Sequence, residues 1–222
     1  MKNQKIQFKR TTPLVRIVGP VLCALLVSLA ALTARAQTAA VIDPQGDAFY
    51  RNGNEAPAFL DILAESFTIS DTLTFTVDVA GPLNALPNPP GSGGTFFWHF
   101  GLNTDPSTNP PGFPEAPGQT ARPEFTVDAF WDGTAFRGVF ADRRPALTGG
   151  SALLYSIPVS VLGSRITLTV PAALAAQVRA AVVLPGATWG STTGWDNTFL
   201  LGHGTDAIHF ADDIGGQHPW PQ

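Results

Sequence analysis

Apolar residues recur at every second position in at least five runs of this chain, and this period decides which folds are open to it. The clearest run, residues 73–79, reads Leu-Thr-Phe-Thr-Val-Asp-Val, and similar runs cover residues 96–102, 125–131, 153–161 and 166–170. A period of two places successive side chains on opposite faces of a β-strand. Many short strands separated by turn residues predict an all-β fold, a single antiparallel β-sandwich with two sheets in a jelly-roll or immunoglobulin-like arrangement.

The alternation also predicts which side chains form the core of this sandwich. A short apolar segment, residues 39–42, is expected to be an edge strand beside it. The predicted core residues are Leu73, Phe75, Val77, Phe96, Trp98, Phe100, Phe125, Val127, Trp131, Ile166, Leu168 and Val182.

Two parts of the chain depart from simple alternation. The apolar residues of the run 59–69 change phase halfway, which predicts a β-bulge near Glu65. Residues 171–179 are the helix candidate that follows the predicted signal segment, and residues 178–184 are expected to form the last core strand. Residues 185–222 contain tryptophan, glycine and histidine without a clear period, and we expect them to form loops and a tail.

The first 36 residues have the pattern of a secretory signal peptide. A basic start precedes an apolar run at residues 17–32, and Ala34-Arg35-Ala36 matches a signal-peptidase site. The sequence thus predicts a signal-peptide helix at 1–36, a sandwich domain at 37–202 and a C-terminal tail at 203–222. It also predicts a secreted or periplasmic protein with no membrane segment after cleavage.

Charge and cysteine content restrict the partners of the exported chain. Residues 1–36 carry six of the 13 basic residues and none of the 17 acidic ones. The remaining chain has seven arginines, no lysine and 17 acidic residues, a formal net charge of −10. Such a surface repels nucleic acids and anionic membranes. Because the single cysteine, Cys23, lies in the signal segment, no disulfide is expected, and the fold needs its own core or a metal ion.

The segment Asp43-Pro44-Gln45-Gly46-Asp47 opens the predicted domain, and Asp61 follows fourteen residues later. Pro44 fixes its own φ, and Gly46 permits a turn with positive φ. Calcium takes six to eight oxygen ligands from carboxylates and backbone carbonyls, which such a bend can supply. Asp, Pro and Gly are also ordinary turn residues, so a simple turn is the alternative to a calcium site.

Several short segments are shared with one known group of proteins. They are Asp43–Asp47, Asp61-Ile62, the strand at 73–77, the aromatic strand ending in Asn103-Thr104-Asp105, and the run from Ile166 to Leu174. Together they resemble the DOMON-like β-sandwiches, which are similar to family 9 carbohydrate-binding modules. The resemblance implies a β-sandwich that binds sugar, haem or no known ligand, frequently with a structural calcium ion.

The same resemblance implies which residues hold the calcium ion. It places Asp43, Asp47 and Asp61 at acidic positions of the group. Relatives often have Asp-x-Asp where this chain has Asn103 and Asp105, and the uncharged Asn103 should weaken any cation held there.

Tryptophans outside the predicted strands suggest carbohydrate as a ligand, because an exposed indole ring can stack on a sugar ring. Trp189, Trp195 and Trp220 lie in segments expected to be loops, and Trp189 and Trp195 are the candidate ligand-binding residues. The alternative is that these rings cap the open end of the sandwich. Trp98 and Trp131 fall on the core faces of their strands, where packing is the expected role.

Histidines raise two further alternatives. Haem needs axial ligands such as histidine or methionine, but the single methionine is the initiator, and His99 is the only histidine outside the tail. In the tail, His203, Asp206, His209 and Asp212 are of types that bind zinc, although they would also suit a solvated acidic tail.

No sequence motif of an enzyme is present. The chain has no G-x-S-x-G elbow, no H-E-x-x-H, no phosphate-binding loop and no cysteine nucleophile in the predicted domain. We therefore expect a non-catalytic binding module. The alternative is an envelope or extracellular protein with a structural or interaction role and no small-molecule ligand.

Overall fold

The computed structural model of the protein describes residues 36–50, 53–90, 94–108, 123–196, 208–213 and 218–221, with the backbone alone described for 208–213. The predicted signal-peptide helix lies outside the described residues, apart from residue 36. None of the described helices has the length and hydropathy that crossing a membrane requires.

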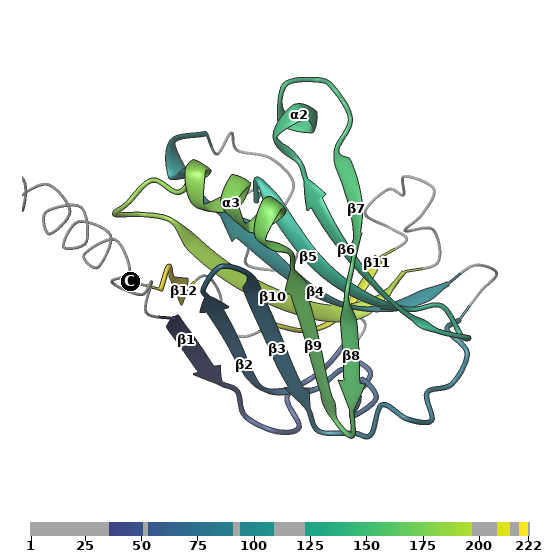
Figure 1. The fold of residues 1–222 in the computed structure, drawn as a ribbon. Helices are drawn as coiled ribbons and strands as arrows, with labels where there is room; N and C mark the ends of the chain where they lie inside the picture. The colour runs from purple at the N-terminus through teal and green to yellow at the C-terminus, as the bar shows by residue number, and fades with distance from the viewer. Residues whose placement is uncertain are drawn as a thin grey trace, which may run out of the picture. The chain divides into compact units, whose positions relative to one another are not determined.

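Two antiparallel sheets face each other and form an all-β sandwich, as the alternation predicted (Figure 1). The first sheet has five strands, in the order β1-β2-β3-β9-β8. Their bounds are β1 Gln37–Ile42, β2 Ile62–Ile69, β3 Leu73–Val79, β9 Arg165–Val170 and β8 Val159–Leu162. The predicted edge strand at 39–42 is therefore confirmed as part of β1.

The second sheet has seven strands, in the order β11-β10-β4-β5-β6-β7, with β12 also paired to β10. Their bounds are β11 Ile208–Asp213, β10 Thr188–Asp196, β4 Thr95–Asn103, β5 Phe125–Trp131, β6 Phe136–Asp142, β7 Leu153–Ile157 and β12 His218–Pro219. The chain leaves this sheet at β7 and enters the first sheet at β8, so the two strands link the layers (Figure 1).

The predicted helix after β9 is confirmed, but the strand expected at residues 178–184 is wrong. Helix α3 spans Ala172–Ala181 and buries Ala175 and Val178, one turn apart, against the sandwich. This segment is rich in alanine, the best helix former, so helix propensity outweighs the short apolar alternation. Two shorter helices, the 3₁₀ helix η1 (Pro106–Thr108) and α2 (Arg144–Leu147), lie in connections.

The core lies between the sheets and contains most of the predicted residues. Ten of them are buried, whereas Trp131 and Val182 are half-buried and pack at its margin. Phe67 and Phe75 stack with ring centroids 4.5 Å apart. Phe67 also meets the edge of Trp189, which lies in the opposite sheet.

Residues 185–222 do not form only loops and a tail. Strand β10 lies inside the second sheet, hydrogen-bonded to β4 over its whole length. Strands β11 and β12, both in the predicted tail, pair with β10. The sequence analysis missed β10 because small and hydroxyl-bearing residues occupy most of its buried positions. The strand reads Thr-Trp-Gly-Ser-Thr-Thr-Gly-Trp-Asp.

The predicted bulge near Glu65 is confirmed by a register shift between Ile62 and Ala64, where β2 pairs with β3. After the bulge, Glu65 is buried and faces the core. There its carboxylate accepts a hydrogen bond from Ser191 Oγ of β10. The bulge therefore joins the two sheets through a buried polar contact.

Candidate functional site

The Asp43–Asp47 turn begins where β1 ends. The Asp43 amide continues the β1–β2 pairing by donating to the Leu63 carbonyl, at 2.9 Å. Gly46 has φ +86°, the left-handed conformation that glycine adopts without strain. This turn directs the Gly46 amide at Asp61, and its N–H donates to Asp61 Oδ2 at 2.9 Å. The turn predicted from Pro44 and Gly46 is thus hydrogen-bonded to Asp61, the third acid predicted to bind calcium.

Asp61 lies just before β2 and is 5% exposed. Its backbone is held on both sides, because its carbonyl accepts from the Ala80 amide at 2.9 Å and its own amide donates to Ala58. The second carboxylate oxygen, Oδ1, is buried and has no hydrogen-bond partner among the described residues. Burying such an oxygen without a partner costs free energy, and a charged oxygen costs more than a neutral one.

The electrostatics of Asp61 favour a cation. Burial raises the pKa of the Asp61 carboxyl, the Gly46 hydrogen bond opposes that rise, and the negative charges of Asp47 and Glu55 add to it. Glu55 comes close because residues 48–50 pair with residues 54–56, with Phe49 bridged to Glu55. The sequence analysis missed Glu55, since only this pairing brings it near Asp61.

The acids of this turn do not form a ready three-carboxylate shell. Among the described residues, no three side chains of His, Cys, Asp or Glu come together as metal ligands. Asp47 and Glu55 are exposed and Asp43 is half-buried, so Asp61 is the one buried side chain among these four described acids. A cation here would take an oxygen of Asp61 first and complete its shell from the exposed acids, backbone carbonyls and water.

The predicted ligands Asn103 and Asp105 lie at the other end of the sandwich from Asp61. Asp61 precedes the start of β2, whereas Phe67, near the end of β2, contacts Trp189. Trp189 pairs with Leu102, the residue before Asn103. The two predicted groups therefore cannot share one ion.

Near the end of β4, the local contacts of Asn103 and Asp105 differ. Asn103 is buried, and its Oδ1 has no hydrogen-bond partner among the described residues. Asp105 instead accepts from the Ser107 amide at 2.9 Å and the Ser107 hydroxyl at 2.7 Å. These bonds lower the pKa of Asp105 and close a turn, so its carboxylate already has local donors.

The tryptophans chosen as sugar-binding residues do not offer exposed rings. Trp189 is 0% exposed and Trp220 is 6% exposed, and both belong to the core. Trp195 is half-buried and packs against the same core. The expectation that Trp189 and Trp195 lie on loops is wrong, because both are in β10. Trp189 therefore has no exposed ring for a sugar to stack on, whereas Trp195 keeps part of its surface exposed, and its role in sugar binding stays a prediction.

The outer face of the seven-stranded sheet carries a polar cluster that the sequence analysis did not identify. His99 Nδ1 lies 2.5 Å from Asp128 Oδ1, and Thr126 donates to Asp128 Oδ2 at 2.8 Å. The register of β4 and β5 places His99 opposite Asp128. Alternation put His99 on this face, but its partner depends on strand pairing, which the sequence does not give.

The predicted zinc ligands of the tail are only partly described. His203 and Asp206 lie outside the described residues. His209 and Asp212 belong to β11, where they pair with Trp195 and Thr193 of β10. The zinc alternative stays untested.

Comparisons with protein-family models, with curated proteins and with solved structures found no match for this chain.

Proposed function

We propose that this chain is an exported, non-catalytic β-sandwich binding module, and that its N-terminal turn binds one structural calcium ion at Asp61. The observation that carries the calcium proposal is the buried Asp61 Oδ1, which has no hydrogen-bond partner among the described residues. The resemblance to DOMON-like domains and the predicted charge of −10 point in the same direction.

Calcium suits the chemistry of this turn because it prefers carboxylate and carbonyl oxygens. Bound at Asp61, it would supply the missing partner of Oδ1 and offset the repulsion from Asp47 and Glu55. Both of these are exposed side chains, so they can change rotamer and turn their oxygens toward the ion at low cost. The Gly46 N–H would remain on Oδ2 and keep the turn in place.

The effect of the ion is structural. It would tie the end of β1 and the paired residues 48–50 and 54–56 to the start of β2, in a chain without disulfides in its exported part. An ion that binds only the folded state adds about 2.7 kcal/mol of stability at a hundredfold excess over its dissociation constant. Extracellular calcium modules bind at about 10⁻⁴–10⁻³ M, so the test needs millimolar calcium.

Thermal unfolding in calcium and in chelator tests this proposal. The wild-type protein should melt higher in calcium, and Asp61→Asn should lose most of that gain, since asparagine can still accept the Gly46 bond but carries no charge. The matched control is Asp71→Asn, an exposed acid outside the turn, which should keep the full gain. Equal melting temperatures of the wild type in both buffers would leave the segment as an ordinary turn.

A further inference from the structure

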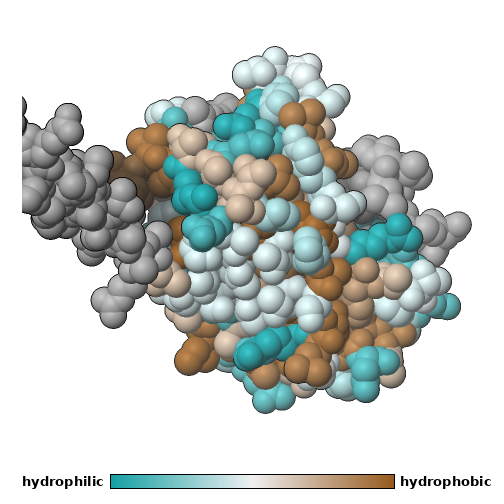
Figure 2. Space-filling view, in the orientation of Figure 1, coloured by the Kyte–Doolittle hydropathy of each residue, from teal (hydrophilic) through white to brown (hydrophobic). Residues whose placement is uncertain are grey.

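The outer face of the five-stranded sheet carries two rows of hydroxyl groups that the strand register aligns. One row consists of Thr38, Thr68, Thr74 and Thr169, and the second of Ser66, Thr76, Thr167 and Ser160. Neighbouring strands lie about 4.7–4.9 Å apart, and side chains two residues apart on one strand are about 6.7 Å apart. All eight side chains are exposed or half-buried. Figure 2 shows this face as a broad pale area of intermediate hydropathy.

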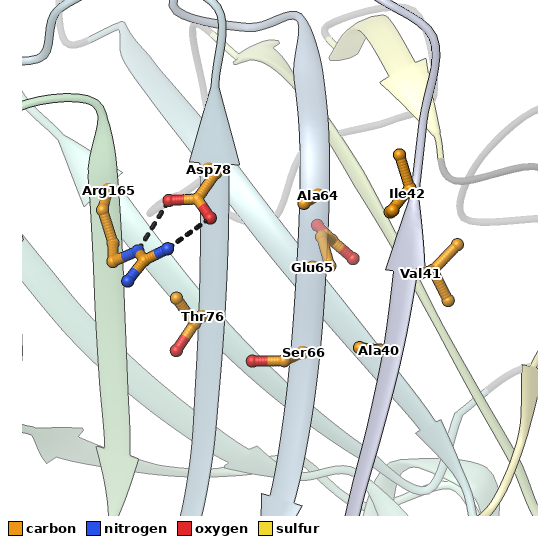
Figure 3. Close-up of a pocket in the computed structure, with 9 residues that line it drawn as sticks. All are labelled: Ala40, Val41, Ile42, Ala64, Glu65, Ser66, Thr76, Asp78 and Arg165. Atoms are coloured by element: carbon orange, nitrogen blue, oxygen red, sulfur yellow. Dashed lines mark hydrogen bonds and ion pairs between the residues drawn. The ribbon is translucent and has the colours of Figure 1, made fainter.

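A hollow of about 270 Å³ lies on the same face, beside the second row. Ala40 and Ala64 have side chains too short to fill it, and Ser66 and Thr76 line one side (Figure 3). Ile42, 85% exposed at the end of β1, adds an apolar wall. The hollow thus combines an apolar floor with hydroxyl groups, as ligand pockets for small polar molecules do.

An ion pair closes the side of the hollow opposite Ile42. Arg165 Nε and Nη2 donate to the two oxygens of Asp78, at 2.6 and 2.7 Å (Figure 3). The guanidinium has five N–H donors, so three remain for a ligand, and the Asp78 oxygens keep further lone pairs. The two parallel hydrogen bonds of the pair present donors and acceptors together at one place.

We propose that this face binds a neutral glycan, with one sugar ring in the hollow and the chain continuing over the hydroxyl rows. The other outward-facing strand positions of this sheet carry no charge, and Asp78 and Arg165 neutralise each other, although the exported chain carries −10 overall. Glu65 also borders the hollow, but it is only 3% exposed and its carboxylate accepts a hydrogen bond from Ser191 of the opposite sheet. A neutral polyol matches such a surface, whereas an anionic polymer would meet a repulsive field. A vicinal pair of sugar hydroxyls can accept from Arg165 and donate to Asp78.

The strand propensity of threonine accounts for only part of this face. Threonine favours β-strands, so hydroxyl groups are expected on an exposed sheet. That preference does not explain why Ala40 and Ala64 open a hollow beside an oriented ion pair. An apolar peptide would need a continuous apolar groove, and Ile42 is the one large apolar side chain lining the hollow on the outer side of β1.

Binding to insoluble polymers tests the proposal with the purified protein in calcium. The probes are cellulose, chitin, xylan and mannan, with alginate as the acidic comparison. Wild type should be retained by at least one neutral polymer. Ala64→Trp, which fills the hollow, should weaken that binding at least tenfold. The double variant Ser66→Ala/Thr76→Val removes two hydroxyls while keeping the size of the side chains, and it should also weaken binding.

A matched pair of arginine variants separates this face from general charge effects. Arg165→Ala should weaken binding at least tenfold. Arg137→Ala breaks a similar exposed pair with Asp132 on the other sheet and should bind as the wild type does. Retention by alginate alone, by none of the polymers, or with equal strength in Ala64→Trp would overturn the proposal. A dimer that Ala64→Trp disrupts, without glycan binding, would instead make this face an interface between copies.

The inference rests on the proposed function in that it assumes a binding module. Failure of the calcium proposal can be told apart from failure of the glycan proposal. The calcium test measures melting temperature without any glycan, and the polymer test measures retention at constant calcium.

Discussion

Replacing Phe67 with alanine should remove a contact that joins the two sheets of the sandwich. The ring is 0% exposed and stacks on Phe75 of β3 at 4.5 Å. Its other neighbours are Trp220 at 5.0 Å and Trp189 at 6.0 Å, both edge to face. Truncation of a buried phenylalanine costs about 3–5 kcal/mol. Aromatic pairs are worth about 0.5–1.5 kcal/mol each, so we expect the upper end of that range.

Guanidinium unfolding followed by far-ultraviolet circular dichroism measures this loss, with an unchanged slope showing that the folded state is still compact. Phe67→Leu should lose less, since leucine fills part of the volume. Phe49→Ala is the matched control, because Phe49 is 50% exposed and should change stability by no more than about 0.5 kcal/mol. A loss below about 1 kcal/mol for Phe67→Ala would refute the packing of β10 and residue 220 against β2.

Three further predictions concern single polar or backbone positions. Ser191→Ala should destabilise the protein by about 1–3 kcal/mol in chemical unfolding, because it removes a donor to the buried Glu65 carboxylate. Gly138→Ala should cost about 1–3 kcal/mol in the same assay, since a Cβ there would lie 2.5 Å from the Ile157 carbonyl oxygen. The pKa of the Asp61 carboxyl is higher in the folded protein than in the unfolded chain. In chelator, the melting temperature of the wild type should therefore fall as the pH rises from about 4. Asp61→Asn removes the titrating group and should make that fall smaller. An unchanged slope in Asp61→Asn would contradict the assigned origin of the shift.

The sequence predicted the strands whose apolar residues alternate and missed the strand whose buried residues are not apolar. In β3, every second residue is a large apolar side chain, and burial follows that alternation. In β10, Gly190, Ser191, Thr192 and Thr193 are all buried, so no contrast between faces marks the strand. The position of this strand follows from pairing with β4 and from packing against the opposite sheet, both of which are long-range contacts.

For the candidate site, the sequence predicted the turn, but it did not predict which side chains from different parts of the chain come close to Asp61. The turn at Pro44 and Gly46 follows from the dihedral preferences of these residues, and the structure places it against Asp61 through one hydrogen bond. Glu55 reaches Asp61 through a pairing that no short motif signals. Asn103 was grouped with the same acids by resemblance, yet the direction of β2 and β4 puts it at the opposite end of the sandwich.

The most direct measurement of the calcium proposal is a crystal structure grown with about 10 mM calcium, well above the expected dissociation constant. An anomalous difference map should show one peak bonded to Asp61 Oδ1 at about 2.3–2.6 Å, with oxygens of Asp47, Glu55 or the turn completing the shell. The same crystals of Asp61→Asn should lack the peak. Density for water alone beside Asp61 Oδ1 in the wild type, with calcium present, would contradict the account.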